Sequence, residues 1–164
     1  MKKRITIAGL WLILFFINDS ASAQESKFKA LFIQKFIEYT NWPDDRNEVV
    51  IGVFGNSQVL LELEKSSNSK RRYTIVKIAG AGDIVKCDVI YLPEAQNRNF
   101  DLVLQATSNK SVLVITDNAS FAEKGSCISF YLEDSKLKFI VNQMAMKKAN
   151  LRVSSALLSL AKVI

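Results

Sequence analysis

Apolar and polar residues recur along the chain with two different periods, and these periods predict its helices and strands. From Lys27 to Thr40 the apolar residues recur at i, i+3 and i+4, which is the spacing of one helix face. Pro43 disfavours helical geometry at Trp42, so the helix is expected to end at or before Trp42. The predicted inner stripe consists of Phe28, Leu31, Phe32, Phe36 and Tyr39.

Two interpretations of this helix end stay open. In the first, Tyr39 and Trp42 pack the helix end against a sheet, with the indole N–H donating to a backbone carbonyl. In the second, the end of the helix meets another chain, since Trp and Tyr are favoured at interfaces. Ile33 and Ile37 widen the apolar side beyond one stripe and form a spare flank. The candidate partner-binding residues are Ile33, Ile37, Tyr39, Trp42 and Pro43.

Short apolar runs that alternate with helical segments predict a layered α/β fold. Three of the runs are apolar on both faces, which is typical of parallel strands covered by helices on each side. Ser57 can cap the helix after the first strand. The predicted strands are 48–54, 73–78, 88–92 and 111–116; the predicted helices are 58–65 and 93–107, with a short helical turn over 118–124.

The pattern changes towards the C-terminus. Residues 128–132 and 137–141 each alternate between apolar and polar positions, which predicts a hairpin and therefore a mixed sheet. A last helix is expected from about Ser154. We thus predict one layered α/β domain: a mixed, mostly parallel sheet with helices on both faces, a C-terminal hairpin and a helix. The expected inner face of that helix is Leu157, Leu158, Leu160, Ala161 and Ile164.

The N-terminus has the pattern of an export signal. Lys2, Lys3 and Arg4 precede a short apolar run, and Ala21-Ser22-Ala23 is a small-residue cleavage site. The run is about ten residues long, whereas crossing a bilayer takes roughly 20. We expect residues 1–23 to be a signal peptide cleaved after Ala23. Residues 24–164 then form an exported domain that does not insert into the membrane.

The charge of the chain does not indicate a nucleic-acid partner. The net charge of +6 falls to +4 without the leader, which contains three basic residues and one acidic residue. The basic cluster Lys70-Arg71-Arg72 is interpreted as a solvated loop before a strand.

The residue types exclude several classes of enzyme. The chain has no histidine, which removes Ser-His and Cys-His nucleophile pairs and histidine metal ligands. Carboxylates are scattered, and no nucleophile elbow of G-x-S-x-G type occurs. We therefore expect no catalytic residues, no metal, no cofactor and no enzymatic activity.

The stretch GVFGNS, residues 52–57, combines a strand, a glycine turn and a helix start. Such a helix N-terminus can hold an anion, but the glycines match neither the dinucleotide fingerprint nor the phosphate loop. A tight turn is the default interpretation. The alternative function is a periplasmic small-ligand binder that uses the Gly55-Asn56-Ser57 turn or the Gly80-Ala81-Gly82 loop.

Cys87 and Cys127 each begin a predicted strand, and an oxidising compartment permits a bridge between them. If strand 111–116 lies between their strands, the sulfurs are about 9.6 Å apart, or two strand spacings. That distance is too long for a disulfide. Two buried, inert thiols are the main expectation, and a Cys87–Cys127 disulfide is the alternative.

Several stretches together resemble the YfiR family of exported regulators. They are KALFIQKFIEYTNWP, IGVFGNSQVLLELE, KCDVIYLPEAQ and the C-terminal part from SVLVITDNASFAEKG to SSALLSLAKV. The ordered set covers essentially the whole mature chain. The matching residues are Tyr39, Trp42, Pro43, Gly52, Gly55, Cys87, Gly125, Phe139 and Asn142.

This resemblance implies a non-enzymatic periplasmic α/β domain that can form a homodimer. It also implies a partner: the periplasmic part of an inner-membrane signalling protein, of diguanylate cyclase or sensor kinase type, which the domain holds inactive. The namesake of the family uses more cysteines for oxidative control, whereas only Cys87 falls in the Cys-led strand here. Most of the matching residues are interpreted as determinants of the fold.

Overall fold

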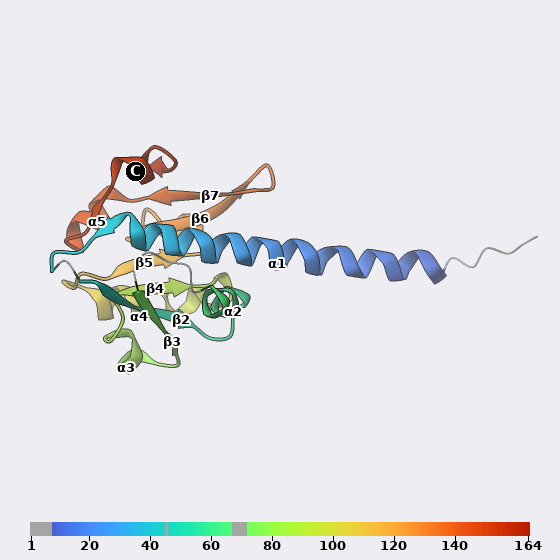
Figure 1. The fold of residues 1–164 in the computed structure, drawn as a ribbon, viewed down its shortest axis with the longest axis horizontal. Coiled ribbons are helices and arrows are strands. Elements are labelled where there is room, and N and C mark those ends of the chain that lie inside the picture. The colour runs from blue at the N-terminus through green and yellow to red at the C-terminus, as the bar shows by residue number, and fades with distance from the viewer. Residues whose placement is uncertain (1–7, 45, 67–71) are drawn as a thin grey trace, which may run out of the picture.

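A seven-stranded mixed sheet forms the centre of the structure (Figure 1), a computed structural model that describes residues 8–44, 46–66 and 72–164. The strands are β2 (Glu48–Phe54), β3 (Arg72–Ile78), β4 (Val89–Leu92), β5 (Leu113–Thr116), β6 (Ile128–Glu133), β7 (Lys136–Val141) and β9 (Lys162–Val163). Their order across the sheet is β3-β2-β4-β5-β6-β7-β9. The first five are parallel, and β7 runs antiparallel to β6. The predicted fold class is confirmed.

Helices cover both faces of this sheet, as the two-sided apolar strands predicted. Every residue of β4 and of β5 is buried. Figure 1 shows α1 running across the sheet beside α2. The helices are α1 (Ala8–Glu38), α2 (Gln58–Lys65), α3 (Ala81–Ile84), α4 (Phe100–Thr107), α5 (Gln143–Lys148) and α6 (Ser155–Leu158), with 3₁₀ turns at Glu94–Asn99 (η1) and Ala119–Phe121 (η2).

The first helix is longer than the predicted one because it includes much of the leader. It runs without a break past Ala23, so cleavage at that point stays a prediction. Within the described residues, no helix has a stretch that is both long and apolar enough to cross a membrane. The basic residues Lys2, Lys3 and Arg4 of the leader, and Lys70 and Arg71 of the basic cluster, lie outside the described residues.

Side-chain caps begin the helices at positions that the sequence indicates. The Ser57 hydroxyl accepts from the N–H of Leu60 at 3.2 Å, which confirms the predicted cap of α2. Asn142 begins α5 in the same way, accepting from Ala145 N at 2.9 Å. Its amide also donates to Ala122 O at 2.7 Å and so ties α5 to the turn before β6. Helix α5 was not predicted from the sequence.

The C-terminal helix is much shorter than predicted. It ends at Leu158, so Leu157 is buried but Leu160 is 73% exposed. The chain then turns back as β9, and the N–H of Ile164 donates to Val141 O at 3.0 Å. The edge of β7 offers backbone hydrogen bonds, and the last residues form these bonds instead of continuing the helix.

Four phenylalanines fix α1 on the sheet. Phe32 and Phe36 project from α1 towards Phe130 of β6 and Phe139 of β7, with ring centroids 4.9–6.3 Å apart. These separations are typical of favourable aromatic pairs. Because Phe130 and Phe139 are cross-strand partners, the hairpin and the helix share one core.

Gly52 lies where two layers of side chains approach the backbone of β2. A Cβ atom at this position would be 2.5 Å from Cys87 Sγ and 2.6 Å from Ile78 Cδ1. Gly52→Ala should therefore lower the free energy of unfolding by about 1–3 kcal/mol through overpacking. Chemical denaturation followed by circular dichroism measures the change.

The matched control is Gly82→Ala, because a Cβ atom at Gly82 meets nothing within 4 Å. That variant should leave stability unchanged or raise it slightly. Adding Cys87→Ala to Gly52→Ala should recover part of the loss, which a double-mutant cycle detects as coupling. Equal stability of Gly52→Ala and Gly82→Ala would contradict this account of the packing.

Candidate functional site

The predicted partner-binding residues separate into buried and exposed groups. Ile33 and Ile37 are completely buried, and Trp42 is buried with its indole N–H donating to Ser111 O at 3.1 Å. Trp42 is thus a core anchor of the kind predicted in the first interpretation. Tyr39 and Pro43 are exposed. The expectation that Ile33 and Ile37 form an exposed flank is wrong, since both side chains lie in the core.

Buried polar residues on α1 explain this error. Lys29 is only 8% exposed, and its ammonium reaches Asp117. Gln34 is buried as well, and its amide donates to Ser66 Oγ at 2.5 Å and to the Tyr73 hydroxyl at 2.8 Å. Both residues belong to the side of α1 that enters the core. A pattern of apolar residues alone assigns them to the solvent side.

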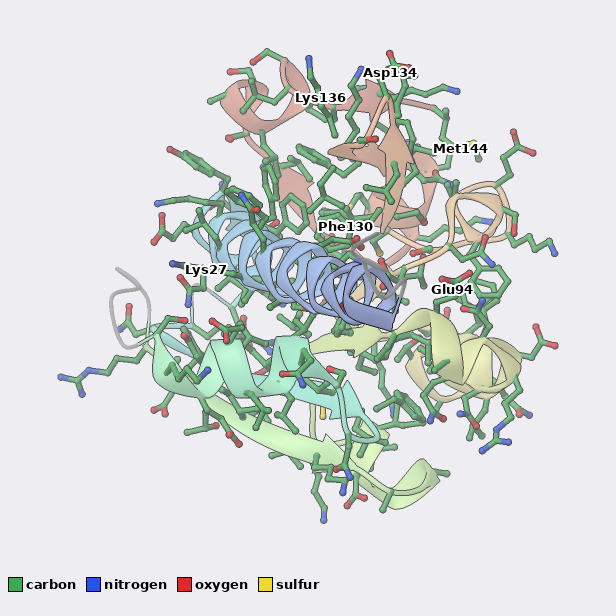
Figure 2. The ribbon with its side chains drawn as sticks, turned by 90° about the vertical axis from the view of Figure 1, so that its right-hand side faces the viewer. Lys27, Glu94, Phe130, Asp134, Lys136 and Met144 are labelled. Atoms are coloured by element: carbon green, nitrogen blue, oxygen red, sulfur yellow. The ribbon has the colours of Figure 1, made fainter. Side chains whose placement is uncertain are left out.

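Three residues of the predicted inner stripe are exposed instead, so that part of the prediction is wrong. We name them the outer stripe: Phe28 and Leu31 on the opposite side of α1, and Tyr39 directly after its last residue. Phe28 and Leu31 are i, i+3 neighbours on the helix surface. Leu132 on the β6–β7 hairpin is exposed too. Figure 2 shows the tip of this hairpin, marked by Asp134 and Lys136, to one side of α1. The outer stripe is therefore open to solvent along the helix.

A small crevice lies at the carboxyl ends of β2 and β4. Here the strand order reverses, since β3 adds to one side of β2 and β4 to the other. In open α/β sheets, ligands bind in the crevice at this switch point. The cavity is about 300 Å³ and is lined by Asn56 and Ser57 after β2, by Tyr91 and Gln96, and by Lys29 of α1.

Charged groups close the inner end of the crevice. The Lys29 ammonium lies 2.7 Å from each carboxylate oxygen of Asp117 and 2.5 Å from Glu25. Burial opposes the charge on Lys29, but the hydrogen bonds to Asp117 and Glu25 outweigh it and raise the lysine pKa. Burial raises the pKa of Tyr91 far above its usual value, so its hydroxyl stays protonated and donates to Asp117 at 3.1 Å.

The crevice thus combines an apolar wall with fixed donors and acceptors. Of the two turns considered for a small ligand, the Gly55-Asn56-Ser57 turn borders it. At the Gly80-Ala81-Gly82 loop, the carboxylate of Asp83 accepts from Ala79 N at 3.1 Å and closes the turn. The polar side chains of the crevice can hold a polar head group. Within the described residues, no group of three or more metal-ligating side chains occurs.

Several polar side chains outside the crevice make structural contacts. Ser154 caps α6 by accepting from Leu157 N at 3.3 Å. Asp44 accepts two hydrogen bonds from the Arg46 guanidinium, which also pairs with Asp88. Asp88 in turn accepts from Val50 N at 2.8 Å. This ion-paired set ties the turn after Trp42 to the start of β4.

Both cysteines are buried and unbridged. Strand β5 lies between β4 and β6, as the geometric argument against a disulfide assumed. Burial raises the pKa of each thiol to about 11, so both are protonated at neutral pH. Neither Cys87 nor Cys127 is a thiolate nucleophile under these conditions.

Comparison with solved structures shows that the fold occurs elsewhere. A conserved domain protein from Vibrio cholerae superposes with a TM-score of 0.58 at 13% identity, over 84% of this chain and 59% of that one. An ABC domain in complex with L-Trp from Streptococcus pneumoniae gives a TM-score of 0.57 at 14% identity, over 80% of this chain. The present chain spans 59% of the length of each. These similarities concern the fold alone.

Comparison with characterised proteins gives no significant match. Comparison with protein families matches residues 26–162 to the family described as YfiR/HmsC-like (DUF4154). The match spans the sheet, the hairpin and α2 to α6, together with the part of α1 that packs on the sheet. The chain therefore belongs to the YfiR/HmsC-like family.

Proposed function

We propose that this protein is a periplasmic regulator that binds the periplasmic part of an inner-membrane signalling protein and holds it inactive. Membership of the YfiR/HmsC-like family indicates a regulatory, non-catalytic role in the periplasm. A diguanylate cyclase or a sensor kinase is the class of partner that we propose. The outer stripe of α1 is the proposed contact surface.

The observation on which this proposal rests is the exposure of Phe28 and Leu31 on one side of α1 and of Tyr39 directly after it. Large apolar side chains that gather on a surface mark interaction sites more often than scattered ones do. Tyr and Phe are suited to this role because they bury a large area on contact. Tyr39 was among the candidates identified from the sequence.

A rigid base supports the outer stripe from beneath. The side of α1 opposite to it is fixed by the four-phenylalanine cluster and by the Lys29–Asp117 ion pair. A contact surface that is ordered before binding loses little conformational entropy on association. Ile33, Ile37 and Trp42 thus contribute to binding indirectly, by holding the helix in place.

Leu31→Glu should weaken partner binding without destabilising the fold, because Leu31 is 49% exposed. Loss of a side chain at the centre of an interface costs about 1.4 kcal/mol or more of binding free energy, which raises Kd about tenfold. The measurement is titration calorimetry with the purified periplasmic domain of an inner-membrane diguanylate cyclase or sensor kinase from the same organism. Light scattering of the same sample tests the homodimer that the family resemblance implies.

Leu61→Glu on α2 is the matched control, since Leu61 has a similar exposure of 45% and lies outside the outer stripe. It should bind the partner with native affinity. An equal loss for both variants would point to a non-specific charge effect. Native affinity of Leu31→Glu would exclude the outer stripe as the contact surface.

The crevice at the switch point favours a second candidate function, which is binding of a small periplasmic ligand. The crevice lies where ligands bind in open α/β sheets, at the switch point of the strand order. Lys29 and Asp117 line it and can form hydrogen bonds with a polar head group. The structural neighbour in complex with L-Trp suggests free amino acids as the first ligands to test.

A ligand present at 100 times its Kd should raise the free energy of unfolding by about 2.7 kcal/mol. Thermal-shift measurements with L-Trp and the other amino acids detect this rise. Asn56→Trp should abolish the shift by filling the crevice, whereas Gln105→Trp, at an exposed position on α4, should preserve it. The absence of any shift with millimolar amino acids would remove this candidate.

A further inference from the structure

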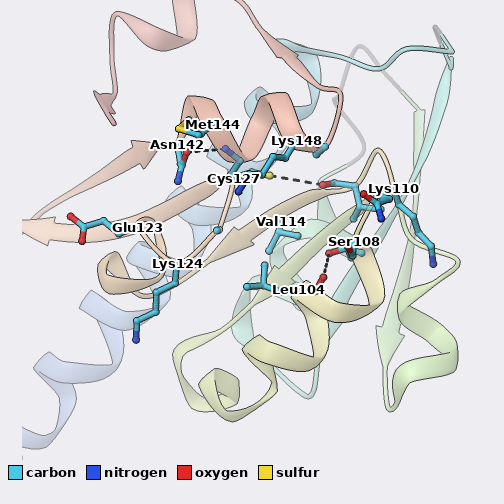
Figure 3. A pocket seen from close by; sticks show the side chains of 16 residues that line it. Leu104, Ser108, Lys110, Val114, Glu123, Lys124, Cys127, Asn142, Met144 and Lys148 are labelled. Atoms are coloured by element: carbon cyan, nitrogen blue, oxygen red, sulfur yellow. Dashed lines mark hydrogen bonds between the residues drawn. The ribbon is translucent and has the colours of Figure 1, made fainter.

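The largest cavity that we describe lies on the other face of the sheet, between α4 and α5 (Figure 3). It is an open groove of about 670 Å³, within the size range of sites for small organic ligands. Helix α1 lies behind the sheet in this view. We name the cavity the α4–α5 groove; it shares no residue with the outer stripe or the crevice.

The floor of the α4–α5 groove is apolar. Val114 and Cys127 come from β5 and the start of β6, and Leu104 and Ala145 come from the two helices. The Cys127 thiol is buried and points towards Val112 O at 3.9 Å. A protonated thiol in such surroundings behaves as a small hydrophobic group. The floor can therefore hold the apolar body of a ligand.

Gly125 keeps the groove open at its centre. Its φ of 117° is a conformation that favours glycine. A Cβ atom there would contact Leu104 at 3.5 Å and narrow the space between the turn and α4. Asn142 fixes the same turn through its bond to Ala122 O. The groove is thus a formed feature of the backbone.

The rim of the groove has an uneven charge. Figure 3 shows Lys148 on α5, Lys110 on the loop after α4, and Lys124 and Glu123 on the turn before β6. Over the part of the chain that the structure describes, Lys110 and Lys148 form no ion pair. The Lys124 ammonium lies 5.6 Å from the ring centroid of Phe121. Lys110 and Lys148 therefore offer positive charge that is not compensated.

We propose that the α4–α5 groove binds a small amphiphilic carboxylate, with its apolar body over Val114 and Cys127 and its carboxylate towards the rim lysines Lys110 and Lys148. An apolar floor alone would accept any hydrophobic molecule. The uncompensated lysines of the rim select an anion over a neutral molecule of the same shape. This site is independent of the proposed partner surface, so either proposal can fail without the other.

The experiment uses octanoate as the probe and titration calorimetry on the purified protein. Octanoate should bind the native protein about fivefold more tightly than octanol, which has the same body without the charge. The double variant Lys110→Gln/Lys148→Gln should bind octanoate about fivefold more weakly, with octanol binding unchanged. These lysines are exposed, so folding should be unaffected.

Two further lysine variants are controls for the effect of Lys110 and Lys148. Lys124→Gln should change the affinity for octanoate by less than twofold, because the neighbouring Glu123 already offsets the charge of Lys124. Lys86→Gln, outside the groove and with its lysine side chain 69% exposed, should leave that affinity unchanged. Ala149→Phe should block both probes by filling the groove, whereas Gln105→Phe, at an exposed position on α4 outside the lining, should bind normally.

Equal affinity for octanoate in the native protein and the Lys110→Gln/Lys148→Gln variant would overturn the proposal. Octanoate binding that survives in a folded Ala149→Phe protein would also overturn it, because the ligand would then lie elsewhere. No detectable binding of octanoate at millimolar concentration has the same consequence. A selective loss in the double variant, with the controls unaffected, supports the groove as the site.

Discussion

Lys29 on α1 donates to both oxygens of Asp117 at the end of β5, and this buried ion pair sets the rotation of the helix. An unpaired charge at this depth would cost several kcal/mol, so the helix cannot turn Lys29 away from Asp117 without a large penalty. Once this rotation is fixed, Ile33 and Phe36 face the sheet and Leu31 faces solvent. The same contact closes the crevice at the switch point.

The fold then distributes its surfaces over separate elements. The outer stripe belongs to one side of α1, and the α4–α5 groove to the opposite face of the sheet. The crevice lies at the carboxyl edge between β2 and β4. Because each surface uses different side chains, a substitution in one surface leaves the side chains of the other two unchanged.

Most of the residues shared with the YfiR family act in the fold itself. Gly52 allows Cys87 and Ile78 to approach β2, Trp42 binds the carbonyl of Ser111, and Asn142 caps α5. Phe139 belongs to the aromatic cluster under α1. Tyr39 and Pro43 differ, since both are exposed, and of the two Tyr39 belongs to the outer stripe.

Local patterns in the sequence determined the elements of this protein. The apolar runs give the strands, Ser57 gives the start of α2, and the alternation after Cys127 gives the hairpin, because these signals depend on neighbouring residues. The carboxyl-end turn with Asn56 and Ser57 could also be identified as a candidate ligand site. Helix α5 was missed because its six residues are too few to show a helical period.

Only the tertiary structure decided which side of α1 is buried and how the chain ends. Lys29 finds its partner 88 residues further along the chain, and Gln34 finds one 39 residues away. A sequence pattern cannot reveal such partners, so it assigns polar residues to solvent and apolar residues to the core. The last residues form β9 for a similar reason, since the free edge of β7 offers hydrogen bonds that no local signal records.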